Sequence, residues 1–64
     1  MDELYRRYRI ALTQTDRWVA RITHVRGNLV PSKVQATLEE GESVCLARAK
    51  ATIDRYLAFL ELPG

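Results

Sequence analysis

The chain has 64 residues, a net charge of +2 and 47% hydrophobic residues, a composition typical of a folded domain rather than a disordered segment. This length fits a single domain over residues 1–64, whose small core would benefit from a second subunit. One cysteine, Cys45, and one histidine, His24, exclude an internal disulfide and a four-ligand zinc site.

The sequence contains no candidate membrane segment. No stretch approaches the ~20 apolar residues that a membrane span requires, and the first residues lack the pattern of a secretory signal. We therefore expect a soluble, cytoplasmic protein that makes no membrane contact.

The first half of the chain is typical of a β-hairpin. Residues 1–7 are mostly polar apart from Leu4 and Tyr5, and we expect the start of this segment to fray. From residue 8 to 13, Tyr8, Ile10 and Leu12 alternate with the residues between them, which indicates a half-buried strand. A helix through Leu4, Tyr8, Ala11 and Leu12 is an open alternative. Turn-forming residues at 14–17 lead to a second strand over 18–25, rich in residue types that favour strands. The two strands are predicted to pair in antiparallel orientation.

A third strand and a helix are predicted after Gly27. Residues 34–38 alternate in the same way as the first strand. Two signals then compete for the start of the helix: Thr37 and Glu40 have the spacing of a capping box, which would start it at Leu38. Gly41 opposes that start, because glycine inside a helix costs about 1 kcal/mol relative to alanine.

We prefer a turn at residues 40–42 with Ser43 as the N-cap. The helix then extends to Leu60, with apolar residues three or four positions apart, and residues 62–64 end it.

Together these elements predict an α+β fold, in which a three-stranded antiparallel sheet is followed by one C-terminal helix that covers one face. Even-numbered residues of the strands, from Tyr8 to Leu38, would face the helix. The opposite face mixes threonine, glutamine and arginine with a few apolar residues. The expected core consists of Ile10, Leu12, Trp18, Ile22, Leu46, Ile53, Leu57 and Leu60.

The predicted helix carries a second apolar row that a single sheet is not expected to cover in full. Tyr56 and Phe59 lie beside the main row, so either the twist of the sheet buries both rings or they form an association patch. We favour a homodimerising protein-interaction module, with a second copy or another small protein as partner. The interface candidates are Tyr56, Phe59, Val19 and Val25, and pairing of edge strands is a further route.

Nucleic-acid binding is the alternative function. Residues 1–33 hold seven Arg and Lys against three Asp and Glu, whereas residues 34–64 hold three against five. Arginine suits phosphate contacts, so the open sheet face is a candidate RNA surface. Trp18 is expected to face the core, which leaves that face without stacking aromatic residues. The candidate contacts are Arg9, Arg21, Arg17 and Arg26.

Catalysis and cofactor binding have little support. Cys45 would lie in the first helical turn and His24 is the candidate base, but nothing in the local sequence brings them together. Buried cysteine is common as a small apolar group. The acidic residues 39, 40 and 42 are explained by the nearby helix N-terminus without a metal ion. We expect a protein that is not an enzyme and holds no cofactor.

Several short segments resemble the small HicB-like antitoxin domains. These are the paired strands with Tyr8-Arg9-Ile10 and Trp18-Val19-Ala20, Gly27 after the second strand, and Thr37-Leu38-Glu39-Glu40 leading toward Ala47–Ile53. The resemblance covers about residues 8–57. It implies a homo-oligomer that neutralises a small ribonuclease toxin.

Overall fold

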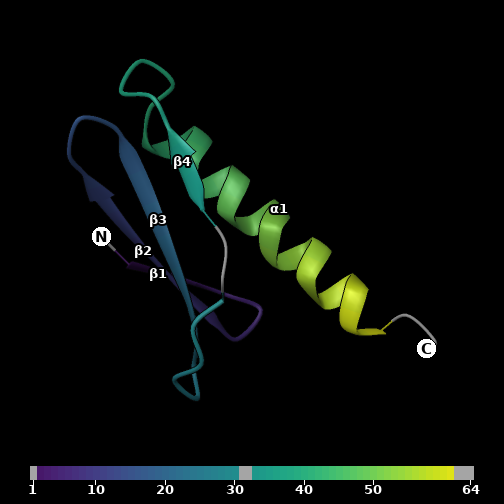
Figure 1. Ribbon diagram of the computed structural model, residues 1–64. Coiled ribbons are helices and arrows are strands. Elements are labelled where there is room, and N and C mark those ends of the chain that lie inside the picture. The colour runs from purple at the N-terminus through teal and green to yellow at the C-terminus, as the bar shows by residue number, and fades with distance from the viewer. Residues whose placement is uncertain (1, 31–32, 62–64) are drawn as a thin grey trace.

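A computed structural model describes residues 2–30 and 33–61, in which four strands form one antiparallel sheet and a long helix covers one of its faces (Figure 1). Each strand pairs with its neighbour in the sequence. The predicted α+β class, with an antiparallel sheet and a C-terminal helix, is confirmed. The elements are β1 (Asp2–Tyr5), β2 (Tyr8–Gln14), β3 (Trp18–His24), β4 (Val34–Ala36) and α1 (Glu42–Glu61).

The prediction of three strands is wrong, because residues 1–7, for which no strand was predicted, contain β1. A two-residue turn joins β1 to β2, so that Tyr5 lies opposite Tyr8. The turn residues Arg6 and Arg7 have φ angles of 49° and 71°. This left-handed geometry matches the twist of a two-residue hairpin, where Asn-Gly or Asp-Gly is the usual sequence. A pair of arginines gives no such signal.

The predicted hairpin of β2 and β3 is confirmed, with Tyr8 opposite His24 and Gln14 opposite Trp18. β3 ends one residue earlier than predicted, at His24. The chain then turns through Gly27, whose φ of 100° suits glycine. It returns beside β3, where the Val30 amide donates to the Ile22 carbonyl at 3.0 Å. The predicted irregular backbone at residues 31–32 lies outside the described residues.

The capping box and the glycine both shape the chain before α1, but at successive positions: the capping box forms a turn at residues 37–40, and Gly41 ends that turn. The Thr37 amide donates to Glu40 Oε1 at 2.8 Å, and the Glu40 amide donates to Thr37 Oγ1 at 3.1 Å, which is the reciprocal pattern of a capping box. Gly41, at a φ of 90°, ends this single turn. β4 therefore stops at Ala36, and Leu38, which we expected to face the helix, is 46% exposed in the turn.

α1 begins at Glu42, so the prediction of Ser43 as N-cap is also wrong. Gly41 occupies the N-cap position, because its carbonyl accepts from the Cys45 amide at 3.3 Å. Ser43 instead lies in the first helical turn. The predicted helix end at residues 62–64 lies outside the described residues.

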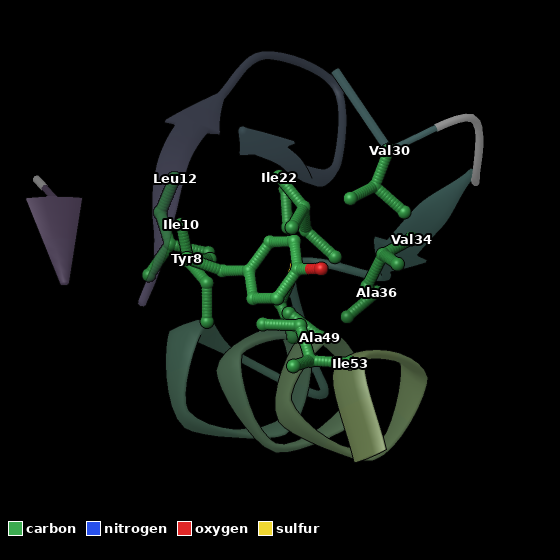
Figure 2. Packing of buried hydrophobic residues seen from close by; sticks show 11 residues of the cluster. Tyr8, Ile10, Leu12, Ile22, Val30, Val34, Ala36, Ala49 and Ile53 are labelled. Carbon is green, nitrogen blue, oxygen red and sulfur yellow. The ribbon is translucent and has the colours of Figure 1, made fainter. Parts of the chain in front are cut away.

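The core fills the space between the sheet and α1. Figure 2 shows side chains from β2 and β3 directed toward Ala49 and Ile53 of the helix. Four predicted core residues are buried: Ile10, Leu12, Ile22 and Ile53. Trp18, Leu46 and Leu57 are partly buried and pack against the core. Leu60 is 59% exposed, so its assignment to the core is wrong.

Candidate association surfaces

The C-terminal part of α1 carries apolar side chains that the sheet does not cover. Cys45, Ala49 and Ile53 are buried at intervals of four residues. Leu60 continues the same stripe, seven residues after Ile53. A helix of 20 residues is about 30 Å long, whereas a strand of seven residues spans about 24 Å. The end of α1 accordingly extends clear of the strands (Figure 1).

Tyr56 marks the point where the core ends. Its ring meets the edge of Tyr8 at a centroid distance of 6.3 Å, and Tyr8 in turn meets His24 at 5.0 Å. Tyr56 is nevertheless 36% exposed, and Phe59, one turn further on, is 70% exposed. The sheet therefore covers part of one ring and little of the other. We call Tyr56, Phe59 and Leu60 the helix overhang.

The open face of the sheet is a second surface, on the side away from α1. Val19 is half-buried there, and Val25 is exposed where it lines a shallow hollow with Arg9 and Thr23. The four interface candidates thus fall on two separate surfaces, with Val19 and Val25 on one and Tyr56 and Phe59 on the other.

Sequence reasoning missed two exposed leucines on the open face. Leu4 lies opposite Arg9, and Leu29 lies opposite Thr23, which places both on this side of the sheet. Leu4 was missed because β1 was not recognised. Leu29 was missed because its single bridge to β3 leaves no alternating pattern in the sequence.

The four nucleic-acid candidates do not form one cluster. Arg9 and Arg21 are exposed diagonal neighbours on the open face, since Arg21 lies opposite Ala11. Arg17 pairs with Asp16 at 3.0 Å at the end of the β2–β3 hairpin. Arg26 is exposed after the end of β3. Two of the four therefore share a surface suited to phosphates.

Polar contacts tie β1 to the helix. The Tyr5 hydroxyl donates to Asp54 Oδ1 at 2.9 Å, and Arg6 donates to the same oxygen at 2.8 Å. Arg6, and then the Tyr5 hydroxyl, lower the pKa of Asp54, while Asp54 raises the pKa of Tyr5. Lys50 adds a contact with Glu3 at 3.6 Å and lies 5.4 Å from the centre of the Tyr5 ring. β1 is paired with β2 along its length, and Asp54 adds the polar link from its end to α1.

Asp54→Asn is expected to loosen β1 selectively, because the amide keeps the shape of the side chain but loses its charge. We expect faster hydrogen exchange of the β1 amides, with little change in β2 and β3. Since folding lowers the pKa of Asp54, its contribution is present above the ordinary value of 3.8 and is lost as the pH falls through the lower folded value. The variant should lack this acid-dependent loosening.

Asp16→Asn is the matched control. Arg17 lowers the pKa of Asp16 as well, but this pair lies in the turn between β2 and β3. Exchange in β1 should therefore match that of the unchanged protein. If the β1 amides exchange hydrogen at the same rate in Asp54→Asn and Asp16→Asn, Asp54 does not anchor β1.

The connection from β4 to α1 is held by Arg48. Its guanidinium donates to the Gln35 carbonyl at 2.9 Å and to Glu40 Oε1 at 3.0 Å. Arg48, followed by the Thr37 amide, lowers the pKa of Glu40. Glu40 thus joins the capping turn to the helix, and this contact accounts for its position without a metal ion.

Cys45 and His24, the two residues considered for catalysis, are each engaged in packing or hydrogen bonding. Cys45 is fully buried, as predicted for a packed cysteine, and burial raises the pKa of its thiol. Nδ1 of His24 accepts from the Arg26 amide at 3.1 Å while its ring packs on Tyr8. Within residues 2–30 and 33–61, no three His, Cys, Asp or Glu side chains gather closely enough to hold a metal ion.

Comparison with protein-family models, curated proteins and solved structures found no match. The resemblance to HicB-like antitoxin domains therefore stays a prediction from short motifs. In the described part of the chain, no helix combines the length and apolar character needed to cross a membrane.

Proposed function

We propose that this protein is a small, non-catalytic interaction module that forms a homodimer through the helix overhang. The observation that carries the proposal is the exposure of Leu60. It belongs to the stripe of α1 that is buried further up the helix, yet it has no cover within the described residues. Together with Phe59 it gives the helix end an apolar surface of the kind found at association sites.

A second copy is the occupant that best suits this surface. Two α1 helices that cross near their C-terminal turns would place the helix overhang of each copy against the other, a contact that closes with two-fold symmetry. A domain of this size buries only roughly 60% of the surface of its unfolded chain, so added apolar burial is valuable. The HicB-like resemblance adds a small ribonuclease toxin as a further partner of the same module.

Phe59→Ser combined with Leu60→Ser tests the proposal. Both side chains are largely exposed in the isolated chain, so the variant should keep its fold, as measured by circular dichroism. Burial of each side chain contributes about 1.5–3 kcal/mol, so we expect loss of both to lower dimer affinity roughly a hundredfold or more. Sedimentation of both proteins over a range of concentrations measures this change.

Leu4→Ser combined with Leu29→Ser is the matched control on the open sheet face. Both leucines are about as exposed as Phe59 and Leu60, and this variant should dimerise like the unchanged protein. The proposal fails if the unchanged protein sediments as a monomer at high concentration. It also fails if the control variant alone dissociates, because the interface would then be the open face.

Nucleic-acid binding has weaker support. Arg9 and Arg21 would contribute phosphate contacts, but Trp18 lies on the helix side of the sheet, opposite Ala36. Proteins that bind single strands stack bases on aromatic side chains, and the described residues of the open face include none.

A further inference from the structure

A basic groove lies between β4 and α1, on a surface that shares no residue with the helix overhang. Lys33, just before β4, and Arg48 and Arg55 of α1 supply its charged side chains, and none of the described residues that line it is acidic. The remaining lining residues are Val34, Gln35, Ala51 and Thr52.

The spacing of the helix residues directs the positive charges into this groove. Arg48 and Arg55 lie seven residues apart on α1, which is two turns or about 10.5 Å. Thr52 lies between them, and its hydroxyl donates to the Arg48 carbonyl at 2.9 Å. Across the groove, the main chain of Gln35 lies at the edge of β4, where its carbonyl accepts from the Arg48 guanidinium at 2.9 Å. The groove therefore has a cationic wall on α1 and the backbone edge of β4 as its other wall.

The three described cations of the groove differ in their hydrogen bonds and ion pairs. Arg48 is held by Glu40 and by the Gln35 carbonyl, so its position is fixed at one end. None of the described acidic side chains forms an ion pair with Lys33 or Arg55. Lys33 and Arg55 thus line the groove as exposed cations. The guanidinium of Arg48 beside them is already held in place.

We propose that the basic groove binds an acidic, extended segment of a partner protein. Arginine takes carboxylates in a bidentate, charge-assisted contact, and lysine adds a mobile point charge. The segment would bind through its side chains rather than as an added strand, because Arg48 already occupies the Gln35 carbonyl at the edge of β4. None of the described residues that line the groove is aromatic, which disfavours single-stranded nucleic acid, where base stacking supplies much of the affinity.

Titration with a fluorescent oligoglutamate peptide tests the proposal. The peptide should bind the unchanged protein at low salt and bind less tightly at physiological salt. Lys33→Glu combined with Arg55→Glu should weaken binding by roughly tenfold or more. Arg48 is left in place, because its contacts hold the β4–α1 connection.

Arg9→Glu combined with Arg21→Glu is the control, since it changes the net charge equally on the open sheet face. It should retain most of the affinity. Equal loss in both variants would reveal attraction by net charge alone and overturn the proposal, as would absence of binding at low salt. A single-stranded RNA that binds the groove more tightly than the peptide would also overturn it. Sedimentation of the Lys33→Glu and Arg55→Glu variant should still report a dimer. Loss of peptide binding can then be distinguished from loss of dimerisation through the helix overhang.

Discussion

Ile53→Ala is expected to destabilise the protein by about 2–5 kcal/mol, the range for truncation of a buried isoleucine. Ile53 is 1% exposed and belongs to the core between α1 and the sheet. Removal of its outer carbons leaves a cavity that a helix packed against a sheet cannot close. For a domain of this size the total stability is of the same order, so a large fraction of the variant should be unfolded at room temperature. Urea unfolding followed by circular dichroism measures the loss.

Leu38→Ala is the control for this experiment. Leu38 lies in the turn before α1 and is half-exposed, so the change should be within about 0.5 kcal/mol. Both variants are compared at one protein concentration, because dimerisation makes apparent stability depend on concentration. An Ile53→Ala midpoint equal to that of the unchanged protein would contradict the helix placement described above.

Ala49→Leu is expected to destabilise the protein by about 1–3 kcal/mol through overpacking. Ala49 is fully buried between Cys45 and Ile53, on the face of α1 that packs against the sheet. A leucine there has to displace its neighbours or lift α1 from the strands. Leucine is nearly as good a helix former as alanine, so any loss reports packing rather than helix propensity. Thermal unfolding provides the measurement.

Ala47→Leu makes the same chemical change two residues earlier on the exposed side of α1. It should shift the unfolding temperature little. If the two leucine variants unfold alike, the helix does not meet the sheet through the face that contains Ala49.

Periodicity in the sequence predicts β2, β3 and the helix, because half-buried elements carry an alternating or helical apolar pattern. It misses β1 for two physical reasons. The turn that forms this hairpin is made by Arg6 and Arg7 in left-handed geometry, without the glycine or asparagine that normally indicates it. The strand is also anchored by Asp54, some 49 residues from Tyr5, and no local pattern contains that contact.

The helix start shows a different limit of sequence reasoning. Thr37, Glu40 and Gly41 each form the structure that their residue types favour. The sequence does not say that the capping turn closes before the helix begins. Likewise, the spacing of Leu60 predicts its face on the helix correctly but says nothing about where the sheet beneath it ends.

The candidate surfaces were predicted only in part. Tyr56 and Phe59 stand out in the sequence because their row widens the apolar stripe of the helix. The basic groove does not, because Lys33 and Arg55 are 22 positions apart in the sequence and meet only when β4 lies beside α1.

The order of the strands has a consequence for how quickly the native state is reached. Each strand pairs with the strand next to it along the polypeptide. Formation of the sheet therefore closes only short loops, and the entropic cost of pairing distant segments is avoided. We expect refolding faster than in β-sandwiches of similar length, with docking of the helix as the step that completes it.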